Sequence, residues 1–165
     1  MGLTGRIVAT YRDPGGALAG MLAGPRREDR LFAILMAACG FLFLAQWPRL
    51  AAEGGAGSAG LPPFEARVAA ALFATLFVLP LCLYALAAAS RWAFRLMGGR
   101  GSHYGARAAL FWALLCIAPL VLAQGAIAGA AGPGAARAAS GAVVFALFLW
   151  LWLGGLRAAE FGGRS

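Results

Sequence analysis

Long apolar runs alternate along this chain with short stretches that carry arginine. Four runs contain no Asp, Glu, Lys, Arg or His, and they cover residues 31–48, 68–90, 108–136 and 138–156. Even the shortest is about 27 Å long as an α-helix, close to the thickness of the hydrocarbon core of a bilayer. Because backbone amides in lipid must bond within their own segment, each run predicts a helix. The expected fold class is all-α: a polytopic membrane protein with four transmembrane helices.

With their flanking residues, the four spans are placed at about 31–48, 67–91, 107–131 and 138–156. Together they form a transmembrane domain over residues 31–157. An arm of residues 1–30 precedes this domain, and a tail of residues 158–165 follows it. The third run is long, which leaves one alternative open: a division at Gln124 and Gly125 into two short spans.

The arm has the pattern of two short amphipathic helices. In the first, apolar residues recur at helical spacing: Leu3, Ile7, Val8 and Tyr11. Asp13 then has the character of an N-cap, and Pro14 suits the first position of the second helix. These helices are expected to lie along the membrane interface, with their apolar faces in the headgroup region. The alternative is a docking surface for a partner protein.

Two faces are distinguishable on the second helix of the arm. Leu18 and Met21 form an apolar face, whereas Gly16, Gly20 and Gly24 recur every four residues along another ridge. A ridge of glycines lets a neighbouring helix approach closely. These five residues are therefore the candidates for packing against a membrane protein partner or a second copy of the chain.

Arginine supplies every basic side chain, and its distribution predicts the orientation. Eleven of the 14 arginines lie in the arm, in the loop between spans two and three, or in the tail. The other three lie in the two loops on the opposite side: Arg49, Arg67 and Arg137. Basic residues favour the cytoplasmic side, so both termini are expected in the cytoplasm. The Ala-, Gly-, Leu- and Arg-rich composition is typical of a high-GC bacterial genome, which indicates a bacterial inner membrane.

The net charge of +8 bears on partners as well. The basic residues flank membrane spans, and neither a recognition helix nor an aromatic platform accompanies them, so nucleic acid is not an expected partner. Anionic lipid headgroups on the cytoplasmic side fit better. The candidate headgroup contacts are the arginines around the second cytoplasmic loop: Arg91, Arg95, Arg100 and Arg107.

Residue types that carry chemistry are sparse. The three cysteines fall within the spans and show no CxxC spacing: Cys39, Cys82 and Cys116. His103 is the only histidine, and one histidine does not make a metal site. The glycine-rich loop at 98–105 lacks the lysine of a phosphate-binding loop, and Ser102 within it suits an N-cap for span three. No catalytic, cofactor-binding or metal-binding residue is predicted, and the protein is not expected to be an enzyme.

Two prolines interrupt the central spans at similar depth. Pro80 precedes Arg91 in span two by nearly the distance at which Pro119 follows Arg107 in span three. A proline within a helix removes one amide donor and frees the carbonyl four residues earlier. If the two kinks face each other, they open an intramembrane cavity, whose candidate residues are Thr75, Pro80, Tyr84, Pro119 and Gln124. The alternative is that both prolines merely bend the helices around their neighbours.

Several short stretches resemble a known family. They are Tyr11-Arg12-Asp13-Pro14, Gly98-Gly99-Arg100-Gly101-Ser102, Phe111-Trp112 and Pro119. In this pattern the chain resembles the bacterial branch of the Yip1 family over residues 11–123. The resemblance implies a multi-helix integral membrane domain with no catalytic residues to carry over; eukaryotic members are linked to membrane trafficking and small GTPase partners. The family commonly has five spans, whereas this sequence supports four.

Two functions are expected from these patterns. The first is a non-catalytic scaffold or accessory subunit that packs against a larger inner-membrane assembly, which requires no reactive side chain. The alternative is a small transporter or lipid-handling protein that uses the proline-broken hairpin of spans two and three, because discontinuous helices often line binding sites in transporters. The absence of Asp, Glu, Lys, Arg and His inside the spans favours the first.

Overall fold

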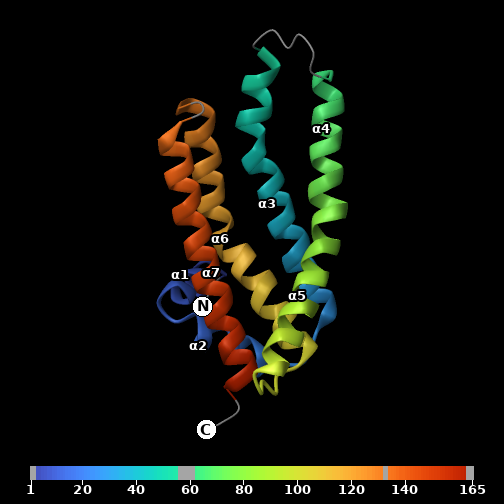
Figure 1. The fold of residues 1–165 in the computed structure, drawn as a ribbon, viewed down its shortest axis with the longest axis vertical. Coiled ribbons are helices and arrows are strands. Elements are labelled where there is room, and N and C mark those ends of the chain that lie inside the picture. The colour runs from blue at the N-terminus through green and yellow to red at the C-terminus, as the bar shows by residue number, and fades with distance from the viewer. Residues whose placement is uncertain (1–2, 56–61, 132–133, 163–165) are drawn as a thin grey trace.

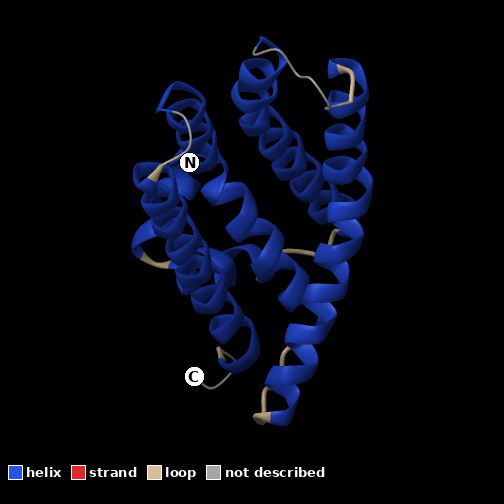
Figure 2. Ribbon diagram, turned by 45° about the horizontal axis from the view of Figure 1, so that its top comes forward, coloured by secondary structure: helices blue, strands red, loops and turns tan. Residues whose placement is uncertain are grey.

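The computed structural model describes residues 3–55, 62–131 and 134–162, and within these ranges it contains helices but no strand. The helices run in the order α1 (Leu3–Arg12), α2 (Pro14–Leu22), α3 (Glu28–Gly55), α4 (Phe64–Phe73), η1 (Ala74–Val78), α5 (Leu79–Leu96), α6 (His103–Ala131) and α7 (Ala135–Phe161). Segments α4, η1 and α5 form one continuous helix (Figures 1 and 2). We call the end where α5 and α7 finish and α6 begins the lower end, and the opposite end the upper end (Figure 1).

Four of these helices are long and apolar enough to cross a membrane: Glu28–Ala51, Phe64–Leu96, His103–Ile127 and Arg137–Phe161. This confirms the all-α polytopic class and the number of spans. Spans one, two and four continue as helix past both ends of their charge-free runs, whereas α6 begins before its run and ends within it, at Ala131. An arginine at a span end can remain helical while its long side chain reaches towards water. The expected tail is accordingly helical as far as Phe161, and residues 163–165 lie outside the described part. The third run forms one helix rather than two short ones.

Helix α6 is the centre of the molecule. It makes its largest interfaces with α3 and α7, while α5 crosses its lower part. Its first half is almost entirely buried and is rich in alanine, which lets the neighbouring helices approach closely. Figure 1 shows α6 and α7 side by side on one side of the molecule, with α3 and the α4–η1–α5 helix on the other. Interface α3–α6 joins the two sides.

The prolines are accommodated in different ways. Just before Pro80 the helix widens into the π-helical segment η1, where the amide of Leu79 donates to the carbonyl of Ala74 five residues earlier. Helix α6 continues through Pro119, and α3 continues through Pro48. Span two therefore carries a local change of helical register, and π-helical segments of this kind occur frequently at functional sites.

Helix α2 is docked on α7. The side chain of Asp13 accepts a hydrogen bond of 2.8 Å from the amide of Gly16, which confirms the predicted N-cap. Pro14 fits against Gly154, where an added Cβ would lie 2.7 Å from the proline ring. Leu18 is buried against Gly155. Two glycines of α7 permit this close packing, together with Gly15 of α2, where an added Cβ would lie 3.3 Å from Ala158.

Helix α1 is tied to α6 by side chains. Tyr11 Oη donates to the carbonyl of Cys116 at 2.5 Å, and Trp112 Nε1 donates to Thr10 Oγ1 at 3.1 Å. The guanidinium of Arg6 lies 5.9 Å from the centre of the Trp112 ring. Burial raises the pKa of the Tyr11 phenol above its ordinary value, which favours the neutral, hydrogen-bonding form still further.

A buried ion pair closes the lower end. The carboxylate of Glu160 on α7 is fully buried, and its Oε2 lies 3.2 Å from Arg91 Nη1 on α5. The amide of Gly101 donates to the same oxygen at 2.9 Å, and the amide of Arg100 donates to the backbone carbonyl of Glu160 at 3.2 Å. A Cβ added at Gly99 would lie 2.7 Å from the Glu160 carboxylate. The glycine-rich loop therefore wraps around a carboxylate of the chain itself.

Candidate functional site

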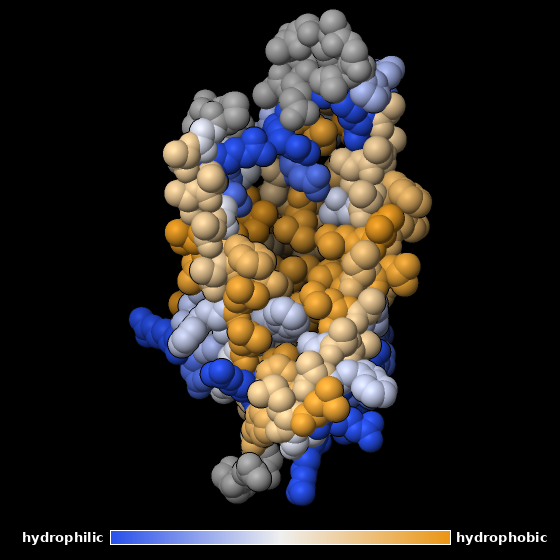
Figure 3. Space-filling model, in the orientation of Figure 1, coloured by the Kyte–Doolittle hydropathy of each residue, from blue (hydrophilic) through white to orange (hydrophobic). Residues whose placement is uncertain are grey.

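A cavity opens in the upper half of the molecule. It has a volume of about 410 Å³ and is lined by residues of α3, η1, α5, α6 and α7: Leu42, Ala45, Gln46, Arg49, Thr75, Leu79, Val121, Gln124, Gly125 and Arg137. Figure 3 shows a hollow between the two sides of the molecule, with apolar side chains in its depth and hydrophilic ones above them. We call this feature the upper cleft. Its size falls within the range of ordinary ligand sites.

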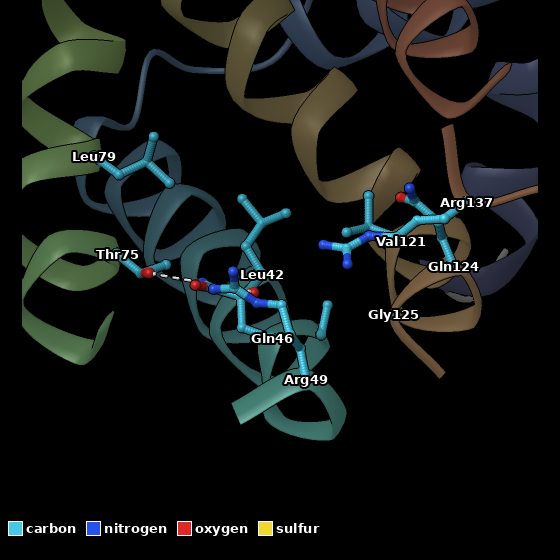
Figure 4. A pocket seen from close by; sticks show the side chains of 10 residues that line it. Leu42, Gln46, Arg49, Thr75, Leu79, Val121, Gln124, Gly125 and Arg137 are labelled. Carbon is cyan, nitrogen blue, oxygen red and sulfur yellow. Dashed lines mark hydrogen bonds between the residues drawn. The ribbon is translucent and has the colours of Figure 1, made fainter. Parts of the chain in front are cut away.

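One wall of the upper cleft comes from α3 and η1. Gln46 Nε2 donates to Thr75 Oγ1 at 3.0 Å and to the carbonyl of Leu42 at 3.2 Å (Figure 4). Thr75 Oγ1 in turn donates to the carbonyl of Ala71 at 2.7 Å. Thr75 is buried within the π-helical segment, so its hydroxyl joins span two to span one at the point where the helical register changes.

The opposite wall comes from α6 and α7. Gln124 and Arg137 project from this wall, across the cavity from Gln46 (Figure 4). Among the residues that the structure describes, the side chains of Gln124 and Arg137 make no hydrogen bond or ion pair with one another or with the rest of the protein. These donors are consequently available to a ligand.

Helices α3 and α6 cross closely beside the upper cleft. A Cβ added at Gly125 would collide with the backbone carbonyl of Ala45. Only glycine allows the two backbones to approach this closely. Gly125 therefore fixes the separation of the two walls.

Polarity changes with depth in the upper cleft. Arg49 and Arg137 lie nearest the upper ends of their helices, followed by the amides and the hydroxyl. The deepest lining residues are apolar: Leu42, Leu79 and Val121. Each lies three or four residues further down its helix than a polar lining residue, which corresponds to about 5 Å. The cleft is thus cationic at its mouth and hydrocarbon at its base.

The lining of the upper cleft suits the binding of a ligand. None of the ten lining residues is acidic, and none is a nucleophile with an adjacent base. Across the described residues, no group of three or more His, Cys, Asp or Glu side chains could hold a metal ion. Guanidinium and amide donors above an apolar base are suited to an anion that carries a hydrocarbon tail.

The structure brings together two of the residues predicted from the proline pattern. Thr75 and Gln124 both line the upper cleft. Tyr84 lies instead at a smaller pocket towards the lower end, Pro80 is buried in α5, and Pro119 lines a groove beneath α1. The two prolines do not face each other across one cavity, because α3, rather than α5, packs along most of α6.

The four arginines predicted to contact headgroups fall into two classes. Arg91 is held by the buried carboxylate of Glu160, and Arg107 Nη2 lies 2.7 Å from Glu28 Oε1. Arg95 and Arg100 have exposed side chains, which leaves them accessible to a headgroup. Two of the four are therefore engaged within the fold.

The predicted partner-packing residues on α2 also divide. Leu18 and Met21 are buried within the hydrophobic core. The glycine ridge meets no neighbouring helix: a Cβ at Gly20 would have nothing within 4 Å, and those at Gly16 and Gly24 would touch only α2 and its cap. The apolar face therefore serves the fold itself, whereas the glycine face is open.

Four important residues were not among the predicted sites: Gln46, Arg49, Arg137 and Glu160. The amide of Gln46 was a visible signal, since it is a polar side chain inside an apolar run. Arg49 and Arg137 had been used only to predict the orientation. Glu160 had been assigned to the tail, and only the extension of α7 through that position reveals its burial.

No family model matches this chain, and neither a curated protein nor a solved structure matches it. Any assignment of function therefore depends on the geometry described above.

Proposed function

We propose that this protein is a non-catalytic membrane protein that binds an anionic lipid in the upper cleft. The phosphate of the lipid contacts Arg137 and Arg49, the amides of Gln46 and Gln124 hold its polar neck, and the first part of an acyl chain lies on Leu42, Leu79 and Val121. The observation that carries this proposal is the ordered change from cationic to amide to hydrocarbon lining with depth.

The polar lining also argues for binding rather than passage. It ends at Gln46, Thr75 and Gln124, and the core below is apolar. A phosphate carried further towards the lower end would lose its hydration without gaining donors, which is costly. A lipid held at the mouth of the cleft avoids this cost, and its chains remain in the bilayer.

The distribution of arginines supports one orientation. The lower end carries most of them, so the positive-inside rule favours a cytoplasmic lower end and cytoplasmic termini. The upper cleft then faces the outer leaflet of a bacterial inner membrane. The bound lipid is accordingly expected to come from that leaflet.

The proposal is tested by native mass spectrometry of the full-length protein in detergent, titrated with phosphatidylglycerol. Arg137→Gln removes one guanidinium from the cleft mouth and is expected to weaken binding of one lipid by about fivefold. Arg157→Gln serves as the matched control, because Arg157 is exposed at the other end of the same helix. Equal affinities of the two variants for phosphatidylglycerol would contradict the proposal.

An accessory-subunit role is the second candidate, and the open glycine face of α2 favours it. In this role a partner helix packs on Gly20 while Leu18 and Met21 hold α2 in place. Gly20→Leu is expected to reduce co-purification of a membrane partner without altering insertion, and unchanged recovery would count against the role. The resemblance to the Yip1 family stays an expectation and is compatible with either candidate.

A further inference from the structure

A second apolar groove lies beneath α1, separate from the upper cleft. It has a volume of about 500 Å³ and is lined by residues of α1, α6 and α7: Ile7, Val8, Tyr11, Pro119, Leu120 and Leu147. Tyr11 is the only lining residue with a polar side-chain atom, and its hydroxyl is already bonded to the carbonyl of Cys116. The groove therefore offers hydrocarbon contact alone.

The groove exists because side chains hold α1 on α6. The hydrogen bonds from Tyr11 and Trp112 fix the position of α1, and Arg6 lies over the Trp112 ring. The backbone of α1 packs more closely on α2 than on α6 or α7. Val8 lines the groove and yet remains 61% exposed, which shows that the described residues leave this side of α1 uncovered.

The charged residues of α1 indicate which kind of ligand would occupy the groove. The only charged residues of α1 are Arg6 and Arg12. Arg12 is exposed and lies four residues after Val8, on the same face of the helix as the groove-lining side chain. The chain continues from Arg12 into α2, which leads to the lower end: a Cβ at Gly105, near the start of α6, would lie 3.9 Å from Leu22. The guanidinium of Arg12 thus lies between the apolar groove and the lower membrane surface.

We propose that this groove binds one acyl chain of an anionic phospholipid from the leaflet at the lower end, with the phosphate held by Arg12. Helix α1 covers the bound acyl chain. The lipid contributes to the attachment of α1, because its chain fills the space that the polar contacts leave between α1 and the α6–α7 pair. This site is independent of the upper cleft and takes a lipid from the opposite leaflet.

The test uses the same titration of the full-length protein with phosphatidylglycerol and, in parallel, with phosphatidylcholine. Val8→Trp places a large ring in the groove and is expected to weaken binding of one phosphatidylglycerol by about tenfold. Ala9→Trp is the matched control, because Ala9 is exposed on the same helix and does not line the groove. Arg12→Gln is expected to weaken phosphatidylglycerol binding by about fivefold and to leave phosphatidylcholine binding unchanged. Arg30→Gln should alter neither, because Arg30 is exposed at the start of α3 and does not line the groove.

The two lipid sites are separable in this titration. Arg137→Gln affects the upper lipid and Val8→Trp the lower one, so a combined variant is expected to lose both. Wild-type binding by Val8→Trp would overturn the lower site, as would an equal loss in Ala9→Trp. Equal affinity of the wild-type protein and Arg12→Gln for phosphatidylglycerol would also overturn it. A failure of Arg137→Gln alone would count only against the upper cleft.

Discussion

The two ends of this molecule differ in whether their polar side chains have partners. At the lower end, the carboxylate of Glu160 on α7 is buried against Arg91 of α5 and the amide of Gly101 in the glycine-rich loop before α6. At the upper end, Gln124 and Arg137 face a cavity without a partner among the described residues. The lower end is therefore held together by polar contacts within the fold, and the upper end is where we propose that a ligand binds.

Backbone packing follows the same division. The first half of α6, towards the lower end, is enclosed by its neighbours. Helix α4, towards the upper end, packs closely only on α3 and on its own continuation η1 (Figure 1). The π-helical segment lies at the boundary between these regions. The difference indicates that mutations at the lower end should affect stability, whereas those at the upper end should mainly affect binding.

The largest effect is expected from breaking the ion pair at the lower end. Glu160→Ala leaves Arg91 without its buried carboxylate and should lower the free energy of unfolding by about 3–5 kcal/mol. The matched control is Glu28→Ala, which removes the partly exposed pair with Arg107 and should cost less than about 1 kcal/mol. Thermal unfolding in detergent measures both. Equal destabilisation by the two variants would contradict the conclusion that polar contacts hold the lower end together.

A smaller effect is expected at the crossing of α3 and α6. Gly125→Ala forces the two backbones apart and should destabilise the protein by about 1–3 kcal/mol, despite the better helix propensity of alanine. Gly40→Ala is the control, because a Cβ there has nothing within 4 Å. That variant should be neutral or should stabilise the protein by up to about 1 kcal/mol. The comparison would fail if Gly125→Ala and Gly40→Ala changed the free energy of unfolding in the same direction and by the same amount.

The smallest effect on stability is expected within the upper cleft itself. Thr75→Val removes the hydroxyl that joins η1 to Gln46 and should cost about 1 kcal/mol. Ser90→Ala, which removes a local bond to the carbonyl of Ala87, should have a smaller effect. If the upper end binds a ligand as proposed, Thr75→Val should also weaken lipid binding while Ser90→Ala leaves it unchanged. A loss of stability comparable to that of Glu160→Ala would remove the distinction between the ends.

Local signals in the sequence predicted local structure well. The charge-free runs predicted the helical class and the four spans because hydrocarbon thickness sets their length. The helix caps were also predictable, because a capping side chain bonds to an amide only a few residues away. Asp13 caps α2, and Ser102 Oγ accepts from the amide of Gly105 at the start of α6. Each of these features depends on residues that are close together in the chain.

Contacts between helices were not predictable in the same way. Gln46 and Thr75 are 29 positions apart, and Gly101 and Glu160 are 59 apart. Whether such residues meet depends on the rotation and pairing of whole helices, which an almost uniformly apolar pattern does not specify. The expected hairpin of spans two and three therefore included two residues that line the upper cleft, Thr75 and Gln124, but grouped them with prolines that lie elsewhere.

The central claim is that an anionic lipid occupies the upper cleft, and photocrosslinking tests it most directly. The full-length protein would be reconstituted with phosphatidylglycerol that carries a photoreactive group near the start of one acyl chain, and the labelled peptides would be sequenced. The account predicts adducts at Leu42, Leu79 and Val121 that decrease about fivefold in Arg137→Gln and persist in Arg157→Gln. Labelling spread evenly over the exposed faces of α4 and α7, and unchanged by Arg137→Gln, would contradict it.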